Sequence, residues 1–484
     1  MDLAKKVSGL GIEDLGRLRL VAAFVPLVLF LAGLAIYMGE EDEEGFEDMT
    51  ESIEDNRALR RYGLASVQVE NETMVYATGF GGPNSLMKWR DGGLVEDTPE
   101  VLRDPETNAI GAAGCDIDGD GQEEIYVLTT GGQFGGRKGT SDRLYDLQNG
   151  SWVDLFKDSD VVNRYAGRSV ACTYTPEGYG FFVARYGGPM QLVVEKNGSL
   201  KDVAPEYRMD RTTGGRSIVN IPTEDGIDIF VGNEQGPNFY YLNRLDSYRE
   251  VGSELGVADT GLPARGATVY DMGKDGDLDL AIANWNSPHR LYRNTGDGFE
   301  DVATEEFSEP TPARSLVAAD FDNNGRTELF LNNIASRGKA PNRLFDSEGK
   351  ALGVGDAREP GGLGTGATVA DLNQDGTLEL VIAHGEAGAQ PLTMYSVPNN
   401  ESAVRIQPVW SSGAPARASY VKVEETGAVY PVDGGSAYLN QMEPWAHIGN
   451  REPPLEVEVV FPDGKSVEKN VTSRTSKIYY PDSS

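Results

Sequence analysis

A motif that recurs at a period of roughly 50 residues restricts the possible folds of this chain more than any other feature. Each copy has an apolar approach, a turn rich in acidic residues and a β-forming run. The four strong copies read GAAGCDIDGDGQEEIYVLTT from Gly111, GATVYDMGKDGDLDLAIANW from Gly266, SLVAADFDNNGRTELFLNNI from Ser315 and GATVADLNQDGTLELVIAHG from Gly366. Weaker copies, which keep the strands and lose the acids, begin at Leu64, Gly167 and Gly215. The chain therefore holds about seven units of one repeat.

Each unit contains several short strands. The acidic run is followed by a loop rich in Gly, Pro and Asn and by further β-forming stretches such as GGPNSLMKW, SPHRLYRN and GDGFEDVA. This pattern predicts a four-stranded blade, and a ring of such blades is a β-propeller. One blade cannot bury both faces of its sheet, whereas blades packed face to face bury a continuous core. We therefore predict an all-β fold with a seven-bladed β-propeller over residues 60–407. An open solenoid of the same repeat is the alternative.

The repeats resemble FG-GAP/VCBS repeats, the units of integrin α-subunit propellers and of many secreted microbial proteins. The stretch GFGGPN, from Gly79 to Asn84, is itself similar to the motif that names the repeat. After about Gln407 a different β pattern begins, and we predict a small β domain over residues 408–484. Within it, GGSAYLNQMEPWAHIG from Gly434 and the later LEVEVVFPDGKSVEKNV resemble the ASPIC/UnbV domain. In the cartilage acidic protein family and its microbial relatives this domain follows an FG-GAP/VCBS propeller directly, so the resemblance implies that architecture here.

The acidic turns predict metal sites. Oxygen-bearing side chains fall at positions 1, 3, 5 and 9 of each strong repeat, with Gly at position 6 so that the chain can turn back around an ion. The candidate ligands are Asp116, Asp118, Asp120 and Glu124; Asp271, Asp275 and Asp279; Asp320, Asp322, Asn324 and Glu328; and Asp371, Asn373, Asp375 and Glu379. Position 7 offers a backbone carbonyl, from Gln122, Asp277, Arg326 and Thr377 respectively.

Hard oxygen ligands in a flexible ring favour Ca²⁺ over Mg²⁺, and the absence of His and Cys argues against Zn²⁺. We predict several structural Ca²⁺ sites. The loop that begins at Asp271 should bind more weakly or through water, because Gly273 replaces the ligand at position 3. The alternative is that these are ordinary acidic hairpin turns.

The N-terminal segment from Leu20 to Met38 is an uncharged apolar stretch of about 19 residues, long enough to cross the roughly 30 Å hydrocarbon layer. Basic residues precede it and acidic residues follow, so the positive-inside rule puts the N-terminus in the cytoplasm. We expect a cytoplasmic tail at 1–18, an uncleaved transmembrane signal-anchor helix at 19–38 and an acidic stalk at 39–59. The protein would then be a single-pass cell-membrane protein with an extracellular bulk. A cleaved signal peptide is the alternative.

The charge balance excludes one class of partner. With 43 Lys and Arg against 76 Asp and Glu, the formal net charge is -33, which makes nucleic-acid binding improbable. Such acidity fits a halophilic source, and a calcium-loaded extracellular protein would also be rich in carboxylates. Sequons for N-glycosylation occur at Asn71, Asn149, Asn197, Asn400 and Asn470.

Two residue types bear on redox chemistry and catalysis. Cys115 and Cys172 occupy matching positions in neighbouring repeats; we interpret them as buried small hydrophobic residues and leave open whether they pair. The three histidines, His289, His384 and His447, are scattered, so no Ser-His-Asp set can be argued. We predict a protein without catalytic activity. A polysaccharide lyase or hydrolase is the alternative, since carboxylate pairs are abundant.

The interpretation that these patterns favour is a binding or adhesion module for an extracellular glycan or protein of unknown identity. A structural subunit of a cell-surface membrane complex is a further alternative. Two loops combine Gly with Arg and Lys, GGQFGGRKGTSDR from Gly131 and NNIASRGKAPNR from Asn332. In so acidic a chain they are predicted contact points for anionic sugars or partner proteins.

Overall fold

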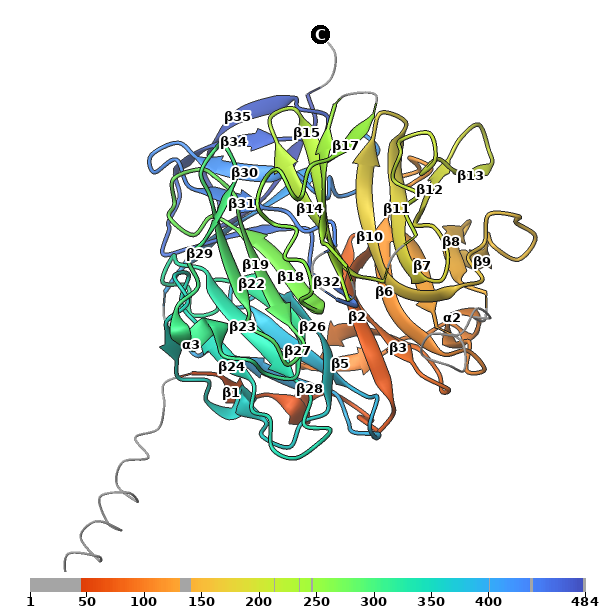
Figure 1. Ribbon diagram of the computed structural model, residues 1–484, viewed down its shortest axis with the longest axis horizontal. Coiled ribbons are helices and arrows are strands. Elements are labelled where there is room, and N and C mark those ends of the chain that lie inside the picture. The colour runs from red at the N-terminus through yellow and green to blue at the C-terminus, as the bar shows by residue number, and fades with distance from the viewer. Residues whose placement is uncertain are drawn as a thin grey trace, which may run out of the picture. The chain divides into compact units, whose positions relative to one another are not determined.

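The computed structural model describes residues 45–481 except 131–140, 213, 235, 245–246, 400 and 436–437. Strands dominate this part of the chain, and its helices are single turns at α2 (Glu100–Arg103), α3 (Glu305–Ser308), η1 (Thr50–Ser52) and η2 (Asp356–Arg358) (Figure 1). The predicted all-β class is therefore confirmed.

The repeats fold into antiparallel sheets, one for each unit. The first three sheets hold β2 (Arg61–Val69), β3 (Glu72–Gly79), β4 (Ser85–Arg90) and β5 (Gly93–Glu96); β6 (Ala109–Cys115), β7 (Glu124–Thr129), β8 (Arg143–Gln148) and β9 (Ser151–Asp154); and β10 (Ala166–Thr175), β11 (Gly178–Tyr186), β12 (Gln191–Glu195) and β13 (Leu200–Asp202). The next three hold β14 (Gly215–Thr223), β15 (Gly226–Asn233), β16 (Phe239–Asn243) and β17 (Tyr248–Glu250); β18 (Ala264–Tyr270), β19 (Asp279–Asn284), β20 (Arg290–Asn294) and β21 (Phe299–Asp301); and β22 (Ala313–Ala319), β23 (Glu328–Asn333), β24 (Arg343–Phe345) and β25 (Ala351–Leu352).

The first strands of the sheets form the inside of a propeller-like arrangement. In chain order β2, β6, β10, β14, β18 and β22 each contact the next, β22 contacts the first strand of the last sheet, and that strand contacts β2 again. Apolar side chains fill the spaces between neighbouring sheets: Phe182 and Leu192 of one sheet, for example, share a buried cluster with Ile229 and Tyr241 of the next. The sheets thus bury one another's faces, as the repeat pattern predicts.

The last repeat sheet is completed by the N-terminal end of the described chain. It holds β26 (Gly364–Ala370), β27 (Glu379–His384) and β28 (Thr393–Ser396), and its fourth strand is β1 (Glu47–Asp48), which pairs with β28. Phe46 is buried, with its ring 4.9 Å from that of Phe321. The prediction of a solvated stalk at 39–59 is therefore wrong for residues 45–59, since this segment packs on the repeat sheets.

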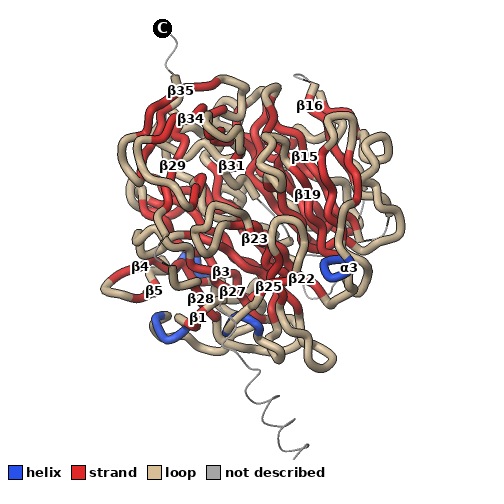
Figure 2. Tube along the Cα trace, turned by 90° about the vertical axis from the view of Figure 1, so that its left-hand side faces the viewer, coloured by secondary structure: helices blue, strands red, loops and turns tan. Residues whose placement is uncertain are grey.

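The C-terminal part adds two small sheets. One holds β29 (Ala403–Val409), β33 (Ala446–Gly449) and β36 (Thr475–Tyr479), and the other β30 (Tyr420–Val423), β31 (Val429–Pro431), β34 (Leu455–Val460) and β35 (Ser466–Val471). Because β29 begins at Ala403, this part starts a few residues before the predicted boundary at 408. Its two sheets share a core that includes Val404, Ile448 and Val457. Figure 2 shows these strands gathered at one end of the repeat sheets.

A short segment of the C-terminal part enters the centre of the repeat sheets. We call residues 438–443 the channel segment; it contains β32 (Asn440–Gln441), which pairs in parallel with β2. Gln441 accepts a hydrogen bond from the backbone of Gly114 on β6, and Glu443 N–H donates to the carbonyl of Val369 on β26. Sequence reasoning placed this segment in a separate domain, whereas residues 45–484 form one compact unit.

The predicted membrane location requires correction. Over the described residues, no helix is long and apolar enough to cross a membrane, and on this finding the assignment as a single-pass cell-membrane protein is overturned. The segments at 1–18 and 19–38, and the first residues of the 39–59 stalk, lie outside the described residues.

Candidate metal centres

The four acidic loops share one location in their sheets. Each follows the end of a first strand and leads into the second strand of the same sheet, so Asp116, Asp271, Asp320 and Asp371 come directly after β6, β18, β22 and β26. Since the first strands surround a common axis, the loops lie at the same end of the arrangement.

The loop that begins at Asp116 brings its predicted side chains together. Asp116, Asp118, Asp120 and Glu124 each place one carboxylate oxygen within 4.8 Å of the others. Backbone groups fix the ring: Gly119 N–H donates to Asp116 Oδ1 at 2.8 Å, and Ile117 N–H donates to Glu124 Oε2 at 2.7 Å. The second oxygen of Glu124, Oε1, is buried and has no hydrogen-bond partner. A buried carboxylate oxygen without a donor fits a cation ligand.

The loop that begins at Asp320 repeats this arrangement. Asp320, Asp322 and Glu328 bring carboxylate oxygens within 4.8 Å of one another. Gly325 N–H donates to Asp320 Oδ2 at 2.9 Å, and Phe321 N–H donates to Glu328 Oε2 at 2.9 Å. Asp320 Oδ1 is buried without a partner. The predicted ligand Asn324 accepts a hydrogen bond from Arg326 N–H at 2.7 Å, and its amide donates to Asp322.

Electrostatics in both loops favour a bound cation. Burial, reinforced by neighbouring carboxylates, raises the pKa of Asp116 and of Asp320 to about 7 and that of Glu328 to about 9. The pKa of Glu124 is raised well above its ordinary value, chiefly by burial. Concentrated negative charge with little solvent is costly, and a divalent cation would offset it.

The other two loops do not assemble a carboxylate cluster within the described structure. In the loop from Asp271, position 3 is Gly273, and both oxygens of Asp279 already accept backbone N–H groups, from Met272 and Asn294. Asp275 accepts from Asp277 N–H. That this loop binds Ca²⁺ more weakly than the others stays a prediction.

In the loop from Asp371, the predicted ligands contact Arg405 and one another. Arg405 Nη1 lies 2.8 Å from Asp371 Oδ2, and the Asn373 amide donates to both Asp375 and Glu379. Thr377 N–H donates to Asp375 Oδ1. Burial still raises the pKa of Glu379, to about 8. Arg405 could not be paired with this loop from the sequence, because it comes from β29 of the C-terminal part.

The C-terminal part touches all four loops, which sequence reasoning missed. Ser412 Oγ donates to Asp116, Val429 N–H donates to Asp271 at 2.9 Å, and Arg405 pairs with Asp371. At the third loop, His447 Nε2 lies 2.6 Å from Asn323 Oδ1. The C-terminal part therefore lies over the acidic end of the repeat sheets.

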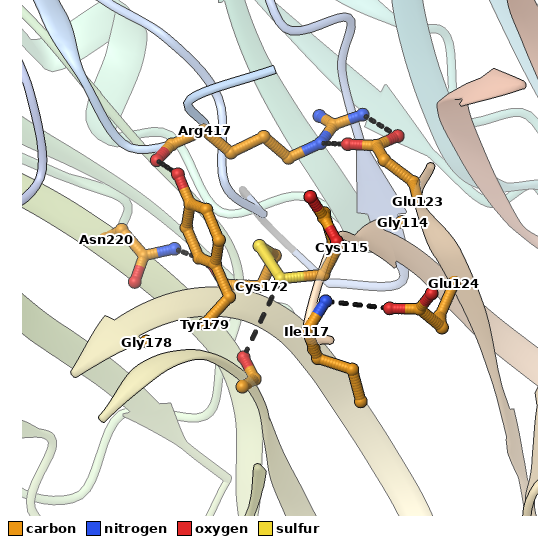
Figure 3. The surroundings of a disulfide bond; sticks show 12 residues. Gly114, Cys115, Ile117, Glu123, Glu124, Cys172, Gly178, Tyr179, Asn220 and Arg417 are labelled. Carbon is orange, nitrogen blue, oxygen red and sulfur yellow. Dashed lines mark hydrogen bonds and ion pairs between the residues drawn. A yellow bond between two sulfur atoms is a disulfide. The ribbon is translucent and has the colours of Figure 1, made fainter. Parts of the chain in front are cut away.

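Figure 3 shows this contact near the first loop. Arg417 forms a buried ion pair with Glu123, with Nη2 3.0 Å from Oε2, and Tyr179 donates a hydrogen bond to the Arg417 carbonyl. Cys115 and Cys172 lie close by and form a disulfide between β6 and β10. Both cysteines are buried, as interpreted from the sequence, and the question of whether they pair, which the sequence left open, is answered by this disulfide. Their matching positions in neighbouring repeats were the signal, since equivalent residues on adjacent first strands face each other, here with a Cα–Cα distance of 5.4 Å.

The remaining predicted sites lie at the surface where the structure describes them. Asn71, Asn149, Asn197 and Asn470 are exposed, so their use as glycosylation sites stays a prediction. Asn400 and the loop 131–140 lie outside the described residues. Arg337 and Lys339 of the other basic loop are exposed.

Sheets built from one repeat, with an acidic loop after each first strand in the strong copies, define an FG-GAP-type repeat protein with a propeller-like fold. The family model described as "FG-GAP-like repeat" matches residues 271–331. The chain is 37% identical to cartilage acidic protein 1 of Xenopus tropicalis, over 89% of this chain and 76% of the relative, and 36% identical to the Homo sapiens protein, over 94% and 77%. The chain belongs to the cartilage acidic protein 1 family.

Among solved structures, the chain is similar to BBS1N in its complex with ARL6DN and to Saccharomyces cerevisiae Sqt1. Each has a TM-score of 0.45 at 11% identity, over 74% of this chain and over 96% and 99% of those chains. The names of the relatives describe no enzyme, and the absence of catalysis stays a prediction.

Proposed function

We propose that this chain is an extracellular binding module: a seven-bladed propeller, stabilised by Ca²⁺, that takes a glycan or protein ligand. The observation that carries the calcium part is the pair of loops at Asp116 and Asp320, each with a buried carboxylate oxygen that lacks a donor. A bound Ca²⁺ ion would supply the positively charged partner that these two oxygens lack. The cyclic contacts of the first strands support the closed ring, with β1 completing its last sheet.

The disulfide supports an extracellular location. Disulfides persist in oxidising compartments and are rare in the cytosol. The Cys115–Cys172 bond joins two neighbouring sheets whose other contacts are non-covalent. The binding role is supported by the FG-GAP-like repeat and by membership of the cartilage acidic protein 1 family.

The test is thermal unfolding of the full chain in 10 mM Ca²⁺ and in chelator at matched ionic strength. Affinities of extracellular calcium modules lie at about 10⁻⁴–10⁻³ M, so each site should add about 1.4–2.7 kcal/mol at this concentration. Glu124→Gln and Asp320→Asn should each reduce the calcium-dependent shift. Asp297→Asn removes the same charge at an exposed position outside these loops and is the matched control.

A calcium-dependent shift that disappears in the double variant Glu124→Gln, Asp320→Asn and survives in the control would support the proposal. Equal unfolding temperatures with Ca²⁺ and chelator in the parent chain would reject calcium stabilisation. The ligand-binding part is tested separately, on a glycan array in the presence of Ca²⁺.

A further inference from the structure

Four arginines occupy equivalent positions at the start of four consecutive first strands. Arg168, Arg216, Arg265 and Arg314 lie on β10, β14, β18 and β22, at the ends of these strands opposite the acidic loops. In each strand the pairing register with the second strand shifts at the arginine, so the arginine is a β-bulge residue. Bulges redirect side chains. We call these four residues the arginine cluster.

The cluster is held together around one tyrosine of the channel segment. Arg216 Nη1 donates to Tyr438 Oη at 2.7 Å. Burial alone would raise the pKa of Tyr438, yet the four arginines together bring it below its ordinary value. The guanidinium groups therefore create a strongly positive potential at this end of the channel, in a chain whose net charge is -33.

Aromatic rings and two carboxylates accompany the arginines. The guanidinium carbons of Arg314 and Arg265 lie 4.2 and 5.7 Å from the centre of the Trp285 ring. Glu234 pairs with Arg216 and Arg265, and Glu386 pairs with Arg314. Among these residues the three guanidinium groups of Arg216, Arg265 and Arg314 share two carboxylates, so positive charge exceeds negative charge.

Two of the guanidinium groups also have donors without acceptors. Arg265 and Arg314 are 3% and 5% exposed, and the Nε–H of each has no hydrogen-bond partner. A buried, charged donor without an acceptor is costly. An oxyanion beside either group would accept the hydrogen bond that its Nε–H lacks and would balance the charge.

The cluster reaches solvent through its outer members. The Glu386 and Glu234 side chains are 34% and 24% exposed, and Trp285 is half-buried. These partly exposed side chains form the solvent-facing edge of the cluster, from which a ligand would have to reach the buried Arg265 and Arg314. An acidic sugar combines the two features that fit here, an oxyanion and an apolar ring face.

We propose that the arginine cluster binds the carboxylate or sulfate group of an acidic glycan, with Arg265 and Arg314 as its donors and Trp285 as the apolar wall. This inference rests on the proposed function as a binding module and names its ligand class. It also places the site at the end of the channel opposite the acidic loops.

The experiment is calorimetric titration of the full chain in Ca²⁺ at fixed ionic strength. The probes are a heparin-derived hexasaccharide, a hexagalacturonate, the neutral maltohexaose and inorganic sulfate. We expect binding of at least one acidic hexasaccharide, none of maltohexaose, and competition by sulfate. Arg314→Gln and Arg265→Gln should each weaken acidic-glycan binding at least tenfold. Arg290→Gln, which removes one arginine from the outer strand β20, should change it less than twofold.

Arg314→Lys keeps the charge and serves as the variant least prone to misfolding. It should bind with intermediate affinity, while a cooperative urea-unfolding transition reports that each variant is folded. Acidic-glycan binding that Arg314→Gln and Arg265→Gln leave unchanged would overturn the site and leave the binding module intact. Binding of inorganic sulfate alone would overturn the glycan ligand. Loss of the calcium shift, with glycan binding retained, would count against the proposed calcium role only.

Discussion

At the residue scale, one capping interaction recurs through the repeats. A side chain in the loop after the second strand accepts a hydrogen bond from the backbone N–H at that strand's end. Asn84, Asn238 and Asn342 do this with their amide oxygens at 2.8–2.9 Å, and His289 does it with Nδ1 at 2.9 Å from Asn284 N. Because Nδ1 accepts, Nε2 carries the proton and donates to Thr311. His289 must therefore be neutral.

This requirement predicts an acid-sensitive site. Burial lowers the pKa of His289 to about 3, whereas an unfolded histidine has a pKa of about 6.5. The contribution of His289 to stability is complete above pH 6.5 and is lost as the pH falls toward 3, because only the unfolded state takes up the proton. Between pH 7 and pH 5 the loss should be about 2 kcal/mol. His289→Asn should remove that loss, as measured by urea unfolding at both pH values.

The reciprocal change is the control. Asn238→His places histidine at the equivalent position one sheet away and should make the chain more acid-sensitive. His447, whose pKa burial also lowers to about 3, is present in every variant and cancels from the comparison. An identical pH dependence for the parent chain and His289→Asn would contradict the prediction.

At the residue scale, the spacing of oxygen-bearing residues could predict part of the candidate metal loops. Alternating oxygens around a Gly identify the Asp116 and Asp320 loops, because their ligands are local in sequence. The Asp371 loop has a nearly equal pattern, but Arg405, which lies 2.8 Å from Asp371, comes from another part of the chain. The local spacing of possible metal ligands cannot reveal that a side chain from elsewhere in the sequence already pairs with one of the carboxylates.

At the scale of elements, the strands of the repeats followed from alternation and turn residues, whereas β1 did not. Residues 45–59 are acidic and lack apolar periodicity, so they suggest a solvated stalk. Only Phe46 contributes a large buried ring, packed edge-on against Phe321 and Phe330. β1 has only two residues and pairs with β28, which lies far later in the chain. Patterns within a short stretch of sequence cannot predict such a pairing.

Phe46 should therefore anchor the closing strand. Phe46→Ala removes a buried aromatic side chain and should cost about 3–5 kcal/mol of unfolding free energy in urea denaturation. Glu47→Ala, at the exposed neighbouring residue on β1, should change stability by less than about 0.5 kcal/mol. If Phe46→Ala were as mild as Glu47→Ala, residues 45–59 would behave as a stalk after all.

At the scale of the whole molecule, the repeat sheets and the C-terminal part form one folding unit. The family resemblance gave their order along the chain, but it did not reveal that the channel segment runs between the first strands. Gln441 binds Gly114 through both amide atoms, and Leu439 accepts from Leu64 N–H. Arg417, fully buried, pairs with Glu123 across the contact.

We therefore expect a single unfolding transition for both parts. Calorimetry should give one peak, coincident with the fluorescence change of Trp410 and Trp445 in the C-terminal part and of Trp89, Trp152 and Trp285 in the repeats. Arg417→Met leaves the Glu123 carboxylate buried without its partner, which should cost about 3–5 kcal/mol and lower that one transition as a whole. A C-terminal part joined only in sequence would instead melt first in this variant, leaving a second peak at the parent temperature. The outcome thus distinguishes a channel segment that holds the repeat sheets together from a domain that only packs against them.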